Sequence, residues 1–434
     1  MMPASAIDEG VAAALASAID AGWSGQVSWL QKLVRFDSLR GRERPCQEWL
    51  AAEFGRRGWE VDGYTLADVG LADLPRAAPM VGVDPAGSVQ VVATVPYSKQ
   101  PSGGRSLILQ GHVDVVPTGP ADMWRDPPFS GEVRDGWLHG RGAQDMKAGI
   151  AAMVFALDAI NAAGYRPAAR VHVQTVTEEE STGNGALSTL ARGYRADACL
   201  IPEPTANTIT RAQSGALWFR LSVRGKPVHV ARSDAGSNAI SAAFLLLQAL
   251  QELADRMNGE AAADAWFGNV PSPVKFNSGR IRGGDWASST PAWCEVDCRL
   301  GILPGRPVDD LRREVERVVA EACAKAPYLT ARPAEIVWNG FLAEGAVLEP
   351  GSDAEATLGA AHEMVLGAPM EARISTAVND TRYYAHGGGM AALCYGPSGK
   401  GMHGFDERAN LDSLKTTTRI LALFIAGWCG LERR

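Results

Sequence analysis

Cysteine pairs of the CxxC type are missing from this 434-residue chain. Its seven cysteines are scattered, and no two of them form a CxxC motif. An odd number of unpaired cysteines argues against a disulfide framework and against a zinc ribbon. Cys294 and Cys298 lie four residues apart in an alternating, strand-like segment, where packing explains them and a redox or metal role is the weaker alternative. Reduced thiols indicate a cytoplasmic protein.

Long apolar runs and blocks of basic residues are also missing. No apolar run reaches roughly 18 residues, so we expect no transmembrane helix. Residues 1–10 contain Asp8 and Glu9 and no basic segment, which argues against a secretory signal. The net charge is −7 and no Lys/Arg block occurs, so a nucleic-acid partner is not expected. These absences leave a small molecule as the expected partner.

The composition, with 46% hydrophobic and 21% charged residues, is typical of a globular enzyme. A chain of 434 residues is longer than one hydrophobic core usually serves, so we expect two or three domains. The first half alternates strand-like and helix-like segments, which predicts an α/β layered sheet. The expected strands are Val89–Val95, Leu107–Leu109, Val171–Val176 and Ala198–Ile201, and the expected helices are Val27–Val34, Cys46–Phe54, Lys147–Ala163 and Ser188–Ala191.

The pattern changes near residue 210. The next segments follow the order β-α-β-β-α-β, which is that of a ferredoxin-like unit. They are Leu217–Val223, Asn238–Met257, Lys275–Ile281, Trp293–Leu300, Val308–Ala324 and Glu335–Trp338. We therefore predict a second domain at residues 210–340, inserted into a discontinuous first domain made of residues 1–209 plus 341–434.

Potential metal ligands follow several expected strands, at the end where open α/β sheets bind their ligands. His112 and Asp114 are two residues apart, so on a strand both would face the same side. The imidazole could then bind a metal while the carboxylate orients it; the alternative is a surface pair in a loop. Asp145 follows a glycine-rich turn and precedes a helix, so it is either a bridging carboxylate or merely an N-cap.

Further carboxylates and a late histidine extend this set. Three adjacent carboxylates, Glu178–Glu180, repel one another. They either form a solvated loop or divide the tasks of binding metal and accepting a proton. Glu203 lies between two prolines, where an exposed acidic turn is the alternative, and His403 lies in a glycine-containing loop. Two imidazoles with several carboxylates suit a pair of zinc-like ions.

In this order, these motifs resemble the acetylornithine deacetylase, succinyl-diaminopimelate desuccinylase and glutamate carboxypeptidase family of dinuclear zinc amidohydrolases. The resemblance covers the chain from about residue 25 to its C-terminus. The matching segments are Gly111–Pro117, Gly140–Lys147, Glu179–Glu180, Glu203–Thr205 and His403. The resemblance implies a layered α/β zinc-peptidase-like catalytic domain, interrupted by a ferredoxin-like α+β lid or dimerisation domain. It also implies a homodimer formed through that lid.

The resemblance also implies a role for each ligand. One zinc would be held by His112, Asp145 and Glu203, and the other by Asp145, Glu180 and His403, with Asp145 bridging. Glu179 matches the general base and Asp114 the partner of His112. The triple glutamate permits a shifted register, but the segment Ser181–Gly185 aligns best when Glu179 is the base.

Four further positions match substrate-contacting residues of the family. His229 matches a histidine that contacts the oxyanion and can come from the partner subunit, and Asn238 follows at the family's spacing. Arg299 and Arg382 match positions expected to bind a substrate carboxylate, a task that suits the arginine fork. Surface ion pairs are the alternative for both arginines.

The expected function is therefore metal-dependent hydrolysis of an amide bond in a small carboxylate-bearing substrate, with N-acyl amino acid deacylation as the first hypothesis. A metallo-carboxypeptidase or dipeptidase is the first alternative, and hydrolysis of another C–N bond on a small aromatic acid is the second. A metal-binding protein without turnover is a different class, but no ligand or base is missing here. Zinc is the expected metal, with cobalt or manganese as alternatives. The sequence names neither the acyl group nor the amine.

Overall fold

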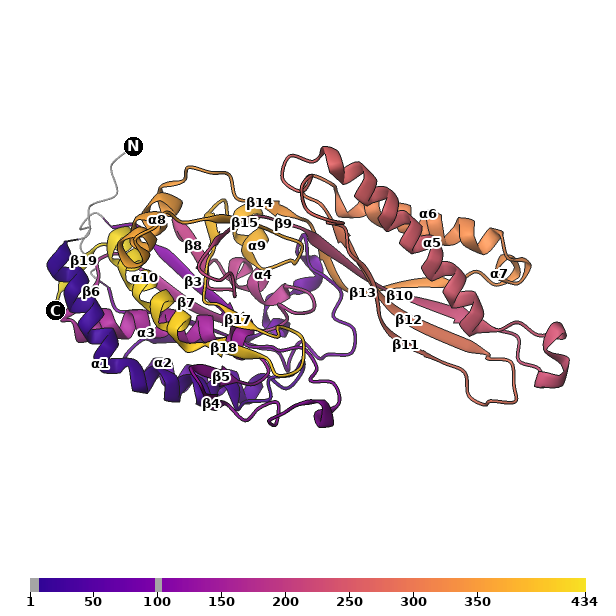
Figure 1. The fold of residues 1–434 in the computed structure, drawn as a ribbon, viewed down its shortest axis with the longest axis horizontal. Helices are drawn as coiled ribbons and strands as arrows, with labels where there is room; N and C mark the ends of the chain where they lie inside the picture. The colour runs from indigo at the N-terminus through magenta and orange to yellow at the C-terminus, as the bar shows by residue number, and fades with distance from the viewer. Residues whose placement is uncertain (1–7, 98–103) are drawn as a thin grey trace.

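The computed structural model describes residues 8–97 and 104–434. Residues 1–7 lie outside this range, and they belong to the segment 1–10 in which we expect no secretory signal. The chain forms a larger and a smaller lobe, which are joined through β10 (Gly215–Arg224) and β13 (Glu335–Ala343) (Figure 1). Each lobe has its own cluster of buried apolar side chains.

A six-stranded mixed sheet organises the larger lobe. Its order is β1-β2-β7-β3-β8-β16, with β7, β3, β8 and β16 parallel and β1 and β2 added antiparallel at one edge. The strands are β1 (Glu60–Thr65), β2 (Val89–Thr94), β3 (Leu107–His112), β7 (Val171–Val176), β8 (Ala198–Ile201) and β16 (Ala391–Cys394). The predicted apolar runs are buried on both faces, as expected of central parallel strands.

Helices cover both faces of this sheet. One face carries α1 (Glu9–Val34), α2 (Arg44–Arg56), α3 (Ala148–Ala162), α8 (Asp353–Leu366) and α10 (Leu411–Cys429), which share one apolar core. The other face carries α4 (Asn184–Ala191) and α9 (Thr381–His386), with Met146 and Tyr384 in a second core cluster. The layered α/β prediction is therefore confirmed.

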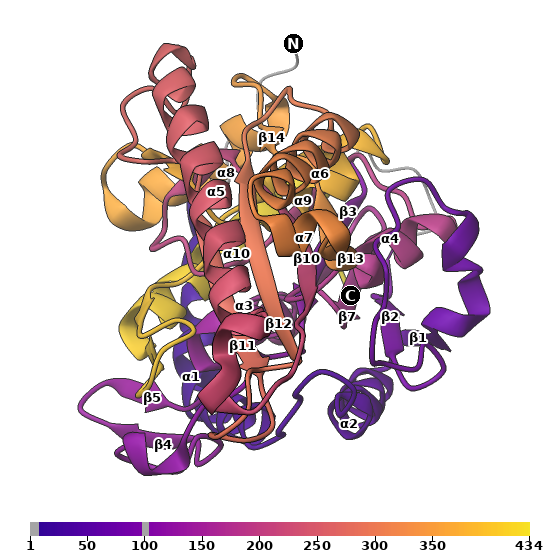
Figure 2. The ribbon, with the colours of Figure 1, turned by 90° about the vertical axis from the view of Figure 1, so that its right-hand side faces the viewer.

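The smaller lobe has the order β10–α5–β11–β12–α6–β13 and a fully antiparallel sheet, β11-β12-β10-β13. The added elements are α5 (Ala239–Glu260), β11 (Phe276–Gly283), β12 (Trp293–Ile302) and α6 (Val308–Ala324). Both helices pack on the same face of this sheet (Figures 1 and 2). The ferredoxin-like prediction is confirmed, while the exact boundaries 1–209, 210–340 and 341–434 remain a prediction.

Two small sheets complete the surroundings of the site. They have the orders β14-β9-β15 and β17-β18-β5-β4. The first contains β9 (Ile209–Gln213), β14 (Ala346–Val347) and β15 (Ala372–Ser375); the second contains β4 (Glu132–Arg134), β5 (Trp137–His139), β17 (Gly399–Lys400) and β18 (Arg408–Asn410). The remaining elements are the pair β6 (Tyr165–Pro167) and β19 (Leu431–Arg433), the short helix α7 (Pro327–Ala331) and single 3₁₀ or π turns.

The structure extends several predicted elements. The first helix begins at Glu9 instead of Val27, because the apolar positions Leu15 and Ile19 also pack into the core. The last lid strand continues to Ala343, where it pairs with β10. Within the described residues, no helix combines the length and hydrophobicity needed to cross a membrane.

Candidate metal centre

The predicted ligands converge at the carboxyl ends of three neighbouring parallel strands. His112 is the last residue of β3, Glu179 and Glu180 follow β7, and Glu203 follows β8. Asp145 comes from the turn that precedes α3. Adjacent parallel strands end at the same edge of a sheet, which is why segments distant in sequence meet here. His403 reaches the cluster from the loop between β17 and β18.

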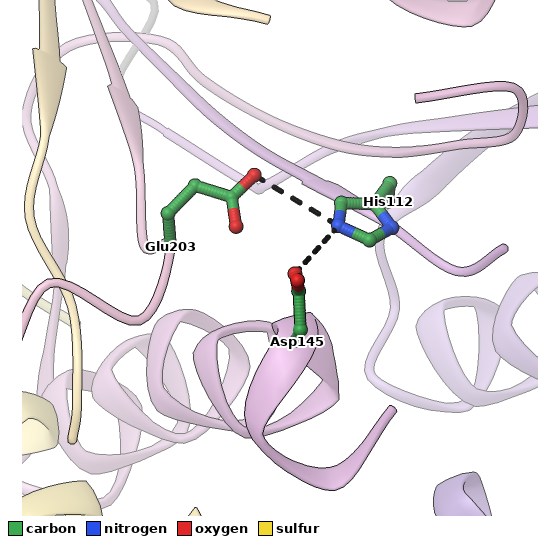
Figure 3. A group of neighbouring side chains, drawn as sticks. All are labelled: His112, Asp145 and Glu203. Carbon is green, nitrogen blue, oxygen red and sulfur yellow. Dashed lines mark hydrogen bonds and ion pairs between the residues drawn. The ribbon is translucent and has the colours of Figure 1, made fainter. Parts of the chain in front are cut away.

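Two groups of ligand atoms share Asp145. His112 Nε2 lies 3.1 Å from Asp145 Oδ1 and 3.8 Å from Glu203 Oε1 (Figure 3). On the other side, His403 Nε2 lies 3.4 Å from Asp145 Oδ2 and 3.1 Å from Glu180 Oε1. Within each group of three, the ligand atoms lie within 4.8 Å of one another. Each oxygen of Asp145 thus faces a different group, which is the arrangement that a bridging carboxylate requires.

The surroundings of Glu203 test whether a cation fits. Its Oε1 atom is buried and makes no hydrogen bond within the described part of the chain. A buried carboxylate oxygen without a partner is costly, and a bound cation would remove that cost. Neither an N-cap for Asp145 nor an exposed acidic turn for Glu203 matches what is observed, since both side chains are buried in the cluster. Imidazole and carboxylate donors suit zinc and similar divalent ions.

The electrostatics of the metal-free cluster favour bound protons. Burial alone would lower the pKa of His112, but its contact with Asp145 and the charge of Glu179 raise it well above its ordinary value. The charge of Glu180 raises the pKa of His403 to about 11. Burial raises the pKa values of Glu179 and Glu203 well above those of exposed glutamates. Metal ligands bind in their deprotonated forms, so cations would replace these protons.

Asp114 orients both sides of the centre. Its backbone carbonyl lies 2.9 Å from His112 Nδ1, whereas its nearest carboxylate oxygen is 3.6 Å from that atom. The carboxylate instead accepts the backbone N–H groups of Glu179 at 3.3 Å and Glu180 at 3.0 Å. Burial raises the pKa of Asp114 to about 8. Its contact with His112 is therefore made through the main chain, while its side chain fixes the two glutamates.

Glu178 differs in role from the two glutamates that follow it. Its carboxylate accepts hydrogen bonds from the Arg40 guanidinium at 2.6 and 2.7 Å. Its φ of 70° starts a tight turn, closed by a hydrogen bond of 2.7 Å from Gly183 N–H to its carbonyl oxygen. Because Arg40 holds the Glu178 side chain, Glu179 and Glu180 are left to face the cluster, and the assignment of Glu179 as the base remains a prediction.

Glu407 connects two ligand loops, although nothing in the sequence pointed to it. Its carboxylate pairs with Arg141 and accepts the backbone N–H groups of Gly142, Gln144 and Asp145 at 3.0 to 3.1 Å. It is buried, with an exposed fraction of 1%. The loop that carries His403 thus supports the turn that carries Asp145.

Two predicted substrate residues lie on the lid, away from the cluster. His229 is exposed, and its Nδ1 atom accepts the N–H group of Ala231. Asn238 caps α5 by accepting two backbone N–H groups, and it lines a separate hollow with Trp286. Of the residues that the structure describes, neither of the two lines the cleft over the metal cluster. Contact of either residue with a substrate remains a prediction.

The two predicted carboxylate-binding arginines already have main-chain partners. Arg299 reaches from the lid sheet to the carbonyl oxygen of Thr376, 3.3 Å away. Arg382 is buried, donates to the carbonyl oxygen of Asn379 at 2.8 Å and packs over the ring of Tyr383. Neither lines the cleft in the described part of the chain, and their binding of substrate remains a prediction.

A cleft of about 110 Å³ opens over the cluster. We call it the metal cleft. It is lined by Asp145, Glu179, Glu180, Glu203, Pro204, Thr205, Thr210, Arg373, Ser375, Ala377, Val378, Asn379, Cys394, Met402 and His403. Pockets that enclose a whole small molecule are usually about 300 Å³ or more, so this cleft is smaller than such pockets. Arg373 and Ser375 are lining residues that the sequence did not indicate.

Three features together indicate the class of dinuclear metal-dependent hydrolases. They are the layered α/β lobe, the ferredoxin-like lid and the aspartate that belongs to both ligand groups. The model of peptidase family M20/M25/M40 matches residues 108–427. The chain belongs to this family, which confirms the resemblance seen in the sequence. It is a metal-dependent hydrolase of amide bonds.

Relatives with assigned activities cover most of the chain. It is 28% identical over 352 residues to N-formyl-4-amino-5-aminomethyl-2-methylpyrimidine deformylase of Halalkalibacterium halodurans, which covers 76% of this chain and 80% of the relative. It is 28% identical over 404 residues to succinyl-diaminopimelate desuccinylase of a Bradyrhizobium species, covering 89% and 95%. The fold is similar to that of human carnosine dipeptidase 1, with a TM-score of 0.75 and 15% identity, over 96% of this chain and 99% of that one.

Proposed function

We propose that this hydrolase is an N-acyl deacylase that removes a small acyl group from an amine in a carboxylate-bearing substrate. The observation that carries the proposal is Asp145 shared between two imidazole–carboxylate groups, with the buried Glu179 beside them. The named activities of both sequence relatives, deformylation and desuccinylation, remove an acyl group from nitrogen. The dipeptidase similarity, at 15% identity, supports the fold and leaves peptide cleavage as the second candidate.

Two divalent ions, with zinc as the proposed metal, would occupy the two ligand groups. His112, Asp145 and Glu203 would hold one ion, and Asp145, Glu180 and His403 the other. When bound, such ions supply Lewis acidity, which makes water more acidic and polarises a carbonyl group. Cobalt and manganese also accept imidazole and carboxylate ligands, so metal analysis of the purified protein must decide the identity.

Glu179 is the proposed general base. It belongs to neither ligand group, yet its Oε2 atom lies 3.9 Å from His112 Nε2, within the same buried cleft. Glu179 would take a proton from the attacking water and return it to the leaving amine. Asp114 holds the Glu179 backbone while this happens. Burial raises the pKa of Glu179, and a raised pKa suits a carboxylate that accepts a proton.

A matched substrate panel tests the deacylase proposal against the peptidase alternative. N-formyl-, N-acetyl- and N-succinyl-L-alanine share their amine with the dipeptides glycyl-L-alanine and β-alanyl-L-alanine. After loading with zinc, faster release of alanine from the acylated compounds supports a deacylase, and faster release from the dipeptides supports a peptidase. Zinc binding without turnover on any compound would contradict both. Addition of a chelator is the control for metal dependence.

A homodimer through the lid is the proposed active form. β11 is an edge strand of the lid sheet, and its residues are mostly exposed. Exposed apolar side chains lie on β11 (Ile281), shortly after it (Trp286) and on α5, which contacts β11 (Phe244 and Leu245). A second copy of the chain would cover them and would bring a His229 towards a metal cleft. The histidine could then stabilise negative charge on the substrate carbonyl oxygen.

Sedimentation of the wild type and of a Trp286→Ser/Ile281→Ser double variant tests this arrangement. We expect a dimeric wild type and a double variant that shifts towards monomer and loses turnover while it keeps its metal. A Leu366→Ser variant on α8, where the side chain is exposed on the other lobe, is the matched control. A monomeric wild type with full turnover would contradict the dimer and the role of His229.

A further inference from the structure

Arg373 places a guanidinium group at the metal cleft. It lies on β15, whose parallel neighbour β9 pairs it with Thr210. Arg373, Ser375 and Thr210 all line the cleft. The register of this pairing shifts between Arg373 and Ile374, so the strand is irregular directly after the arginine. The arginine therefore lies on a short, irregular strand whose backbone is paired with β9.

The guanidinium of Arg373 has no partner of its own. It makes no hydrogen bond, ion pair or ring contact with any residue that the structure describes, and the side chain is exposed. The other arginines near the cleft differ in this respect, since Arg299 and Arg382 donate to backbone carbonyls and Arg211 pairs with Glu355. Arg373 does influence Cys394 in the cleft: burial raises the pKa of that thiol to about 12, and the arginine opposes the shift.

The charge balance of the cleft favours an anion beside Arg373 once metal is bound. Four carboxylates line the cleft, from Asp145, Glu179, Glu180 and Glu203. Two divalent cations would neutralise them, and the liganding imidazoles would be neutral. Arg373 would then be an uncompensated positive charge at the edge of the site. An arginine fork binds a carboxylate through two parallel charge-assisted hydrogen bonds.

We propose that Arg373 is a specificity-determining residue that binds a carboxylate of the substrate a few bonds from the amide that is cleaved. This inference rests on the proposed deacylase function and names the residue that would select its carboxylate-bearing substrates. Arg373 and the four carboxylates line the same cleft of about 110 Å³, which places the arginine close to the reacting carbon. The anion can belong to the acyl group, as in a dicarboxylic monoamide, or to the amine, as in an amino acid.

Four probe substrates separate these two sources. N-succinyl-L-alanine and N-butyryl-L-alanine differ only by the acyl carboxylate, and the corresponding alaninamides lack the carboxylate of the amine. Zinc-loaded wild type, Arg373→Gln and Arg373→Lys are compared by kcat/KM. For one pair of probes, we expect the ratio of kcat/KM for the charged member to kcat/KM for the uncharged member to fall about 10- to 100-fold in Arg373→Gln. The ratio should fall less in Arg373→Lys, which keeps the positive charge but loses the two parallel N–H donors of the guanidinium. The control is Arg256→Gln on α5, an exposed arginine of the lid.

The outcomes separate the inference from the proposed function. An equal loss on all four probes, or no loss on any, would overturn the role of Arg373 while leaving a deacylase. If the wild type cleaves none of the probes, the proposed function fails on this panel. Calorimetric titration of the zinc-loaded protein with succinate then tests the arginine directly. Binding that weakens at least tenfold in Arg373→Gln supports it, whereas equal binding, or none in the wild type, overturns it.

Discussion

The carboxylate of Glu407 accepts the backbone N–H of Asp145 at 3.1 Å. These residues are 262 positions apart in sequence. The same carboxylate binds Arg141 and the N–H groups of Gly142 and Gln144, so one buried anion fixes the whole glycine-rich turn. The loop that carries Glu407 also carries His403. The position of the shared aspartate and that of a histidine ligand are therefore set by one side chain.

Replacing Glu407 with glutamine should weaken metal binding. The amide keeps the shape of the side chain but removes its charge and one acceptor oxygen, and it leaves Arg141 buried without a counter-ion. We expect zinc affinity to fall about 10- to 100-fold and the free energy of unfolding to fall by roughly 3–5 kcal/mol. Calorimetric zinc titration and urea unfolding measure the two effects.

An exposed glutamate on the same side of the fold provides the control for Glu407. Glu132 on β4 is exposed, so Glu132→Gln should change neither quantity. If folded Glu407→Gln protein binds two zinc ions as tightly as the wild type, Glu407 does not support the metal centre.

Replacing Glu179 with glutamine should separate metal binding from turnover. Glu179 belongs to neither group of ligands, so the variant should retain its metal. A glutamine cannot accept and return the proton, so kcat should fall by about 10²- to 10⁴-fold. Metal analysis and steady-state kinetics on the same preparation check both statements. Full activity in the variant would refute Glu179 as the base.

The sequence predicted those features that depend on local patterns. The apolar runs before His112 and Glu203 are central strands, and their ends place both residues at one edge of the sheet. The β-α-β-β-α-β order likewise predicted the lid, because each of its elements is long enough to show its own periodicity. Local pattern therefore predicted that these residues lie at strand ends, while the order of the strands in the sheet was not predicted.

Contacts made by very short strands could not be predicted in this way. β17 has two residues and β18 three, too few for a periodic signal, yet they bring Glu407 to the Asp145 turn. Arg373 reaches the metal cleft through β15, whose pairing with β9 joins residues more than 160 positions apart. His229 and Arg382 matched family positions through their local segments, and a local segment does not reveal which groups distant in sequence the side chain contacts.

Replacing Asp114 with asparagine should impair the two glutamates more than the histidine. The carboxylate accepts two N–H groups, from Glu179 and Glu180, and an amide offers only one oxygen for them. His112 would keep its contact with the backbone carbonyl of residue 114. We expect kcat to fall about 10- to 100-fold while the ion held by His112 remains bound. The prediction would be wrong if the variant lost the ion held by His112 while kcat per bound metal stayed unchanged.

Metal binding should release protons and strengthen as the pH rises. The charge of Glu180 raises the pKa of His403 to about 11, so at pH 8 the metal-free protein carries an imidazolium at this position. Burial likewise raises the pKa of Glu203 well above that of an ordinary glutamate, so this carboxylate also keeps its proton to higher pH. Both groups bind a cation only after losing their protons, so each displaced proton should increase the affinity about tenfold per pH unit below the pKa of its group. The dependence should flatten above about pH 11 for His403.

Calorimetric titrations with zinc at pH 8, in two buffers of different ionisation enthalpy, count the protons released. We expect more than one proton for the wild type and about one fewer for His403→Asn, which can carry no imidazolium. The exposed His229 is the matched control, and His229→Asn should release as many protons as the wild type. Equal proton release from wild type and His403→Asn would mean that His403 does not exchange its proton for metal, and the second ligand group would then lose its only imidazole.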